Sequence, residues 1–197
     1  MHPAINLLEF DSIAVGIAAG DAMAKRAPLA TLHAGTVHPG KYLVLAGGEV
    51  ACVEEARLAG IEVGADSLLD EIYLPEVHSE VVRALTGYRQ ANDHSAIGVL
   101  EVTTVAATIG AADAGIKGAE VSLLEVRLAD GLGGKGYVLF GGELSNIEAA
   151  MEAGELSLAS ANLKVGAVVI PQIHHEMSEN LLAHSEFAAR INPGRYK

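Results

Sequence analysis

The chain has 197 residues, half of them hydrophobic, and a formal net charge of −12. This acidity argues against nonspecific binding to nucleic acid or to an anionic membrane, because both need clustered Lys and Arg. No apolar stretch approaches the roughly 20 residues that span a bilayer. The single cysteine, Cys52, excludes an intrachain disulfide framework. We therefore expect a soluble cytoplasmic protein with one large domain or two small ones.

The chain contains an internal duplication, shown by four landmarks that occur twice in the same order. They are Ala-Ile-x-x-Leu-Glu (4–9, 96–101), an Asp-Ala segment ending in Lys (19–25, 111–117), Gly-Lys leading to Gly-Gly-Glu (40–49, 134–143), and Pro-x-x-His (75–78, 171–174). The polar stretch 88–95 separates the copies. We predict one domain over residues 1–92, a second over 93–180, and a C-terminal extension over 181–197.

The first copy predicts alternating strands and helices. An apolar segment at 5–10 predicts a strand, and Ser12 after it can cap a helix. Two strands joined by a Gly-rich loop are expected at 30–36 and 42–46. A second helix begins after the double glycine, and Gly60 is expected to close it. A last strand leads into the Pro-x-x-His landmark.

The second copy predicts the same order of elements. Thr104 can cap its first helix, which has a buried stripe at helical spacing formed by Val105, Ile109, Ala112 and Ile116. In its second helix, Ser145 and Glu148 have the spacing of a capping box, and Gly154 is expected to end the helix. The first three strands are expected at 97–102, 121–128 and 137–140.

The order β-α-β-β-α-β is that of the split βαβ, or ferredoxin-like, arrangement. We therefore predict an α+β fold. It consists of two tandem domains, each an antiparallel sheet with helices packed on one face.

The repeated landmarks resemble the bacterial microcompartment domain. In the second copy these are 98–101, 112–114 with Lys117, 134–135, 141–143 and the Pro-x-x-His ending. Both copies are unpermuted, so the chain resembles the tandem, trimer-forming class of shell protein, of the propanediol type. The resemblance implies a structural protein and not an enzyme. It also implies a homotrimeric pseudohexameric tile that assembles with other microcompartment shell proteins in the cytoplasm.

The resemblance assigns roles to individual positions. Lys25 and Lys117 match the lysine at the edge between neighbouring tiles, although each is also typical of a solvated helix lysine. The loops 35–40 and 129–134 match the loops around a central pore for small metabolites; the alternative is two ordinary hairpin loops. The implied pore-lining residues are Val37, His38, Pro39, Asp130, Gly131, Leu132 and Gly133. Where the family usually carries Arg after the landmark Pro, this chain has Glu76 and Gln172, which suggests selective neighbours.

His38 raises the question of a metal. In some propanediol-type tandem shell proteins a Cys stands here, and three thiolates hold an iron–sulfur cluster on the threefold axis. Such clusters prefer thiolates, and Cys52 belongs to a helix away from the loop, so we expect no cluster. Three imidazoles on an axis can instead hold one divalent metal. The alternatives are a polar lining without metal and a His38 that points elsewhere.

Three rival functions remain at this point: a metal- or redox-centre-carrying tile with His38 as ligand, a small-molecule sensor, and an enzyme. An enzyme is disfavoured because no nucleophile–base set is visible, and His174-His175-Glu176 lacks a second His at the zincin spacing. No cofactor is expected. Leu181, Leu182 and Phe187 suggest an apolar extension that packs on the tile or on a partner.

Overall fold

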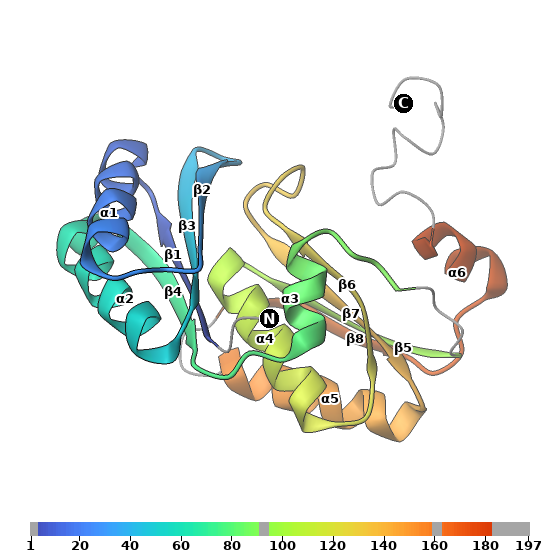
Figure 1. The fold of residues 1–197 in the computed structure, drawn as a ribbon. Coiled ribbons are helices and arrows are strands. Elements are labelled where there is room, and N and C mark those ends of the chain that lie inside the picture. Colours follow the sequence, from blue (N-terminus) through green and yellow to red (C-terminus); the bar gives the residue numbers. More distant parts are fainter. Residues whose placement is uncertain (1–3, 91–94, 159–162, 183–197) are drawn as a thin grey trace.

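The computed structural model describes residues 4–90, 95–158 and 163–182, which form two similar halves side by side (Figure 1). The first half contains β1 (Ala4–Phe10), α1 (Ile13–Arg26), β2 (Thr31–Val37), β3 (Lys41–Gly48), α2 (Val50–Gly64), a short 3-10 turn (Ala65–Ser67), β4 (Leu68–Leu74) and α3 (Ser79–Leu85). The second contains β5 (Ala96–Val102), α4 (Val105–Gly118), β6 (Ser122–Leu128), β7 (Gly136–Gly142), α5 (Leu144–Leu158), β8 (Lys164–Ile170) and α6 (His175–Leu182).

Each half builds its own antiparallel sheet, with strand orders β2-β3-β1-β4 and β6-β7-β5-β8. The registers match: Leu7 of β1 lies between Leu45 and Ile72, and Val99 of β5 lies between Leu139 and Val168. One difference is a bulge in β6 between Leu123 and Glu125, which β2 lacks. The predicted α+β fold with two duplicated sheets is confirmed.

The predicted helix starts after the first strands are confirmed. The backbone N–H of Val15 donates to Ser12 Oγ at 3.3 Å, and that of Ala107 donates to Thr104 Oγ1 at 3.2 Å. Each hydroxyl satisfies one of the amides that the first helical turn leaves without an intrahelical acceptor.

The predicted ends of α2 and α5 are wrong. Both helices continue one turn past Gly60 and Gly154. A Cβ at Gly60 would lie 2.5 Å from Leu8 Cδ1, and one at Gly154 would lie 3.0 Å from Leu100 Cδ2. These glycines therefore allow close helix-to-sheet approach instead of capping. The predicted capping box is also wrong, because α5 begins at Leu144 and Ser145 is already helical.

Two further helices were not predicted. α3 follows the first Pro-x-x-His landmark, and its start is capped when the Glu80 N–H donates to His78 Nδ1 at 3.3 Å. α6 follows the second landmark and is the counterpart of α3. Leu181 of α6 packs on the second sheet, whereas Phe187 lies outside the described residues.

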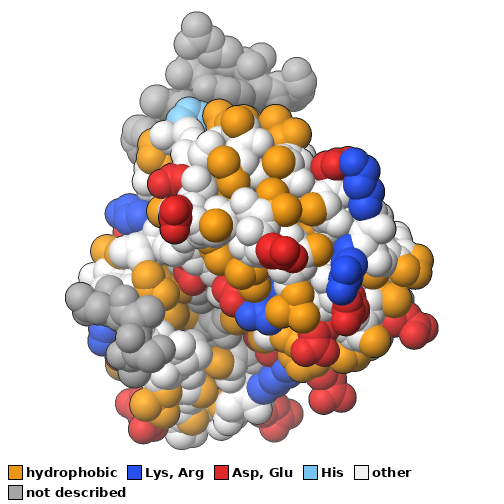
Figure 2. All heavy atoms as spheres, turned by 90° about the vertical axis from the view of Figure 1, so that its left-hand side faces the viewer, with side chains coloured by type: hydrophobic (Ala, Val, Ile, Leu, Met, Phe, Trp, Pro, Cys, Tyr) orange, Lys and Arg blue, Asp and Glu red, His pale blue; other side chains and the backbone are white. Residues whose placement is uncertain are grey.

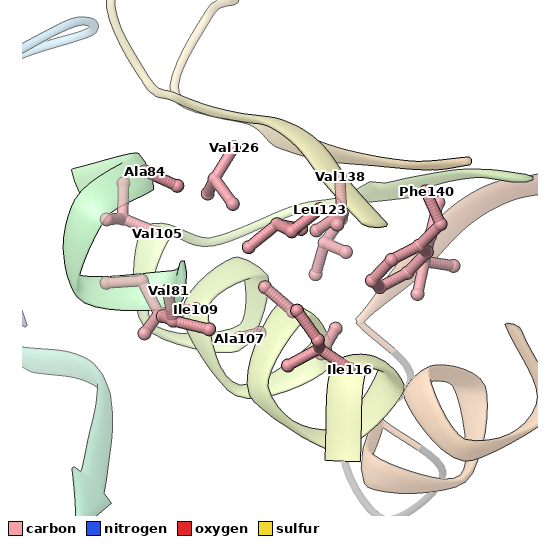
Figure 3. Close-up of a cluster of buried hydrophobic side chains, with 14 of the residues drawn as sticks. Val81, Ala84, Val105, Ala107, Ile109, Ile116, Leu123, Val126, Val138 and Phe140 are labelled. Carbon is pink, nitrogen blue, oxygen red and sulfur yellow. The ribbon is translucent and has the colours of Figure 1, made fainter. Parts of the chain in front are cut away.

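The largest hydrophobic core is shared between the halves. It joins Ile5 and Leu7 of the first sheet to Ile109 of α4 and Val81 of α3, and Figure 3 shows α3, α4, β6 and β7 contributing side chains to it. The expectation of helices on one face only is therefore wrong for the first sheet. Its inner face packs on α1 and α2, and its outer face packs on α4 from the second half.

Candidate functional site

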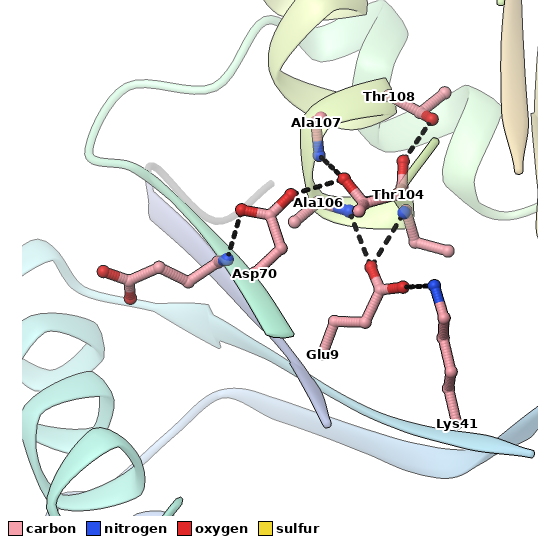
Figure 4. A network of polar contacts seen from close by, with 9 residues as sticks. Glu9, Lys41, Asp70, Thr104, Ala106, Ala107 and Thr108 are labelled. Atoms are coloured by element: carbon pink, nitrogen blue, oxygen red, sulfur yellow. Dashed lines mark hydrogen bonds and ion pairs between the residues drawn. The ribbon is translucent and has the colours of Figure 1, made fainter. Parts of the chain in front are cut away.

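The contact between the halves is built on the start of α4. Glu9 at the end of β1 is fully buried, and its Oε2 accepts from the backbone N–H of Val105 at 2.8 Å and of Ala106 at 3.4 Å (Figure 4). Its Oε1 accepts from Lys41 Nζ at 2.6 Å. A carboxylate at a helix N-terminus is stabilised by the unpaired amides and by the helix dipole. The carboxylate of one half therefore caps a helix of the other half.

Polar contacts continue along α4. Thr104 Oγ1 donates to the Asp70 carboxylate of β4. Near the other end of the helix, the His78 N–H donates to Asp113 Oδ1 at 2.8 Å. Lys117 Nζ pairs with Asp113 at 2.5 Å and donates to the backbone carbonyl of Glu76. α4 is thus bonded to the first half at both ends.

The apolar part of this contact lies between those ends. Val105 and Ile109 of α4 are fully buried. Gly110 lies beside Ile72 of β4, because a Cβ built at Gly110 would be 3.1 Å from Ile72 Cδ1. A glycine at this helix position lets the strand side chain approach the helix backbone.

The counterpart helix α1 presents the same stripe to solvent. Ile13 and Ile17, which match Val105 and Ile109, are 41% and 54% exposed. Ala18 matches Gly110 and is exposed, and Asp21 matches the buried Asp113. Figure 2 views the side of the molecule on which α1 and α2 lie, where hydrophobic side chains stand among charged ones. The stripe that is buried on α4 is therefore uncovered on α1 of the single chain.

The counterpart strands are uncovered as well. Glu101, which matches Glu9, pairs with Lys135, but its side chain is 38% exposed. Val168, which matches Ile72, is 50% exposed.

On the outer face of the second sheet, the Tyr137 hydroxyl donates to Glu125 Oε2 at 3.0 Å. Burial, followed by the charge of Glu125 and this hydrogen bond, raises the pKa of Tyr137 to about 12.

The two loops predicted to line a pore lie against each other at the junction of the halves. The His38 N–H donates to Asp130 Oδ1 at 3.1 Å, and the His38 ring Nδ1 lies 3.4 Å from the same oxygen. Both side chains are mostly exposed, at 77% and 68%. A Cβ at Gly134 would lie 2.8 Å from Pro39 Cδ. The sequence did not predict this His38–Asp130 pair.

The remaining loop residues differ in their exposure. Gly131 and Gly133 are exposed and have φ values of 75° and 65°, in the left-handed region that favours glycine. Leu132 is half-buried, and Val37 packs against the shared core. His38, Pro39 and Asp130 therefore present the most accessible side chains of the two loops.

Lys25 and Lys117 lie in the last turns of α1 and α4. Lys25 is exposed and pairs with Asp21 at 2.5 Å. Lys117 is half-exposed at the domain contact described above. Their predicted role in contacts with neighbouring tiles stays a prediction.

The described residues of one chain bring no three His, Cys, Asp or Glu side chains together as a metal site. Cys52 is the third residue of α2, half-buried. A metal at His38 would need imidazoles from several chains, so that hypothesis stays untested. Among the described residues no helix is long and apolar enough for a transmembrane span.

Comparison with known proteins identifies both halves. A family model described as "BMC domain" matches residues 4–77 and again 96–173. The chain is 38% identical over 177 residues to the bacterial microcompartment shell protein PduT of Citrobacter freundii, covering 90% of this chain and 96% of that protein.

Two solved structures extend the comparison. A microcompartment protein from Desulfitobacterium hafniense DCB superposes with a TM-score of 0.78 at 38% identity, covering 89% of this chain and 98% of that one. The fused permuted hexameric shell protein MSM0275 from the RMM microcompartment shares the fold, with a TM-score of 0.57 at 17% identity over 78% of this chain and 84% of that one.

Proposed function

The chain belongs to the bacterial microcompartment domain family and is a tandem-domain shell protein, and we propose that three copies close into a ring with a central metabolite pore. Its role in the shell is structural and not catalytic. The observation that carries the proposal is that each chain contains one complete domain contact and the two halves of a second, unmade one.

The second contact has most of the polar parts of the complete one; the exception is Asp70, which accepts from Thr104 and is matched by Gly166. Within the chain, Glu9 accepts from the first amides of α4. Glu101 is the corresponding carboxylate, and Ile13 and Ala14 supply the corresponding first amides of α1. These groups lie on opposite sides of a single chain, so they can meet only between chains. Asp21 and Lys25 are likewise the counterparts of the residues that bind the backbone of the first Pro-x-x-His landmark.

The apolar parts of the unmade contact also fit each other. The complete contact sets a large side chain, Ile72, against Gly110. In the unmade contact a smaller strand residue, Val168, faces a larger helix residue, Ala18. The two substitutions offset each other in volume, which favours α1 of one chain on the second sheet of the next. Ile17 is 54% exposed in the single chain, so covering it would contribute about half of the roughly 1.5–3 kcal/mol that full burial of an Ile side chain gives.

A contact between two different surfaces of the same chain is head-to-tail, and repeating it produces either a closed ring or an open filament. The hexameric tile implied by the family resemblance sets the number of domains at six. Three tandem chains supply these, with three contacts inside chains and three between them.

The ring would surround its axis with loops of two kinds. His38 and Asp130 are already neighbours where two domains meet, so a ring would carry alternating copies of both side chains. Imidazole and carboxylate groups offer hydrogen-bond donors and acceptors to polar solutes. We propose that small polar metabolites pass here, and that other shell proteins pack at the outer edges.

The test compares two matched substitutions. Ile17→Lys places a charge in the proposed contact, whereas Leu58→Lys places one on α2 at a side chain of similar exposure, 51%. In light scattering the wild type and Leu58→Lys should have three times the 20.3 kDa mass of one chain. Ile17→Lys should be a monomer with an unchanged circular dichroism spectrum. An Ile17→Lys protein that is still trimeric would contradict the proposed contact.

A further inference from the structure

The edge strands β2 and β6 occupy corresponding positions in the two sheets but differ sharply in solvent exposure. In β6 the residues from Leu123 to Val126 are all buried, with Leu124 only 4% exposed. In β2 the corresponding stretch, from Leu32 to Ala34, is exposed. An uncovered edge strand offers free backbone N–H and C=O groups for pairing with another segment.

The cover of β6 comes from α3 and the segment after it. Val81 and Ala84 of α3 pack in the same core as Leu123 and Val126. Beyond the helix, the Gln90 N–H donates to the Leu124 carbonyl at 3.0 Å, so the chain reaches the edge of β6 at this residue. The Arg89 side chain pairs with Glu125 on the outer face of the sheet at 3.0 Å. This segment leaves the first half and covers the second.

The segment with the same relation to α6 is the C-terminal tail. α6 stands 96 residues after α3 in the repeat, as the two landmark histidines His78 and His174 show. Ser185 and Glu186 are therefore the counterparts of Arg89 and Gln90. In the proposed ring, the element that corresponds to β6 is β2 of the neighbouring chain. The 15 residues after Leu182 are long enough to run along a strand of seven residues.

A pocket lies beside β2, whereas the corresponding space beside β6 is occupied by a side chain. It has a volume of about 390 Å³ and is lined mainly by Ile5, Thr31, His33, Leu45, Val82 and Leu85. In the second half the extra bulge residue, Leu124, is buried with Ile97 and Leu139 in the corresponding place. Because β2 lacks the bulge, its pocket has no side chain to fill it.

The tail carries an aromatic residue at the required position. Arg89 points to the outer face, and side chains on an extended segment alternate between faces. The residue two positions after the counterpart of Arg89 therefore faces the pocket side, and in the tail that residue is Phe187. The linker has the small Ala91 at the same position, where β6 supplies Leu124 instead.

We propose that residues 185–188 of each chain pair with the free edge of β2 on the neighbouring chain and insert Phe187 into the pocket under α3. This is a strand added to a sheet edge, in which the backbone gives affinity and one side chain gives specificity. The proposal rests on the proposed ring, because the pocket belongs to a different chain from the tail. It makes the tail a strap that ties each subunit to the next.

The experiment is thiol cross-linking in a Cys52→Ser background, with the oligomeric mass measured on the same samples. His33→Cys combined with Phe187→Cys should give covalent dimers and trimers with a short bifunctional thiol reagent. The matched control, Leu58→Cys combined with Phe187→Cys, should stay monomeric after denaturation. A trimer by light scattering without interchain links, or with links inside one chain only, would overturn the strap and leave the ring intact. A monomer would overturn both.

A second measurement keeps the native cysteine and uses a milder change. In the trimer, Phe187→Ala should make the amides of residues 31–34 exchange hydrogen at least about tenfold faster, because the pocket loses its filling side chain. Ile191→Ala, further along the tail, should leave that exchange unchanged. Equal exchange in Phe187→Ala and wild type would overturn the insertion of Phe187.

Discussion

Removing the Glu9 carboxylate should destabilise the folded chain strongly. Glu9→Ala deletes the acceptor for two amides at the start of α4 and leaves the Lys41 ammonium without its partner in a site where the carboxylate is fully buried. Breaking a buried ion pair by removing one partner costs about 3–5 kcal/mol. The lost amide bonds are part of the same network, so their cost is not added to this figure. We expect the free energy of unfolding to fall by about 3–5 kcal/mol.

The assay is urea unfolding followed by circular dichroism, in the Ile17→Lys background so that trimer formation does not contribute. The control is Glu101→Ala, the counterpart substitution. In the single chain the Glu101–Lys135 pair is exposed at both side chains, and such a pair contributes about 0–1 kcal/mol. If Glu9→Ala and Glu101→Ala unfold at the same urea concentration, Glu9 does not hold the two halves together as described.

Four other predictions concern the tile edge, the pore, a metal at His38 and the pH dependence of stability. Changing Lys25 and Lys117 together to Ala should abolish flat sheets in negative-stain microscopy of the trimer fraction, because Ala cannot donate to a neighbouring tile. The variant should also have a weaker trimer, because Lys117 binds the Glu76 carbonyl across the domain contact and Lys25 is its counterpart. Sheets that persist would show that the edge assignment is wrong. His38→Ala should change solute permeability while altering trimer stability by no more than about 1 kcal/mol, as expected for an exposed side chain. If three His38 rings hold a divalent metal, the wild type should copurify with one metal per trimer and His38→Ala with none. For Tyr137, the folded chain holds the phenol proton more tightly than the unfolded chain, since its pKa is raised from 10.0 to about 12. Its contribution to stability is therefore complete below pH 10 and is lost as the pH rises toward 12. Tyrosinate absorbance in a protein whose other tyrosines are Phe should show this, and Glu125→Gln should lower the pKa part of the way back to 10.

Most of the fold could be predicted because the sequence pattern of each element occurs in both copies of the repeat. Ser12 and Thr104 cap their helices as the sequence indicates, since capping depends on residues within one turn. The ends of α2 and α5 could not be predicted in the same way. Glycine is common just after the end of a helix, which is why Gly60 and Gly154 indicated helix ends. In the structure they lie within the helices, where they allow close packing on Leu8 and Leu100, which are distant in sequence.

The positions of the candidate site residues could be predicted from the sequence, but the residues that they contact could not. The landmarks located the loops that contain His38 and Asp130, yet nothing in the sequence indicates that these side chains meet across the two halves. The same holds for Glu9, because its place in the repeated Ala-Ile-x-x-Leu-Glu landmark does not indicate its partners. Its partners lie 96 and 97 residues away, in the other copy. Contacts between copies depend on how the halves dock, which local patterns do not encode.

In the proposed ring, the exposed stripe of α1 and the exposed outer face of the second sheet form one contact, and this contact closes with three chains. Native mass spectrometry of the full-length wild-type protein tests it most directly. We expect a dominant species of three chains, and no series that continues to higher numbers by single chains. A dominant monomer or dimer, or an open series of oligomers, would contradict it.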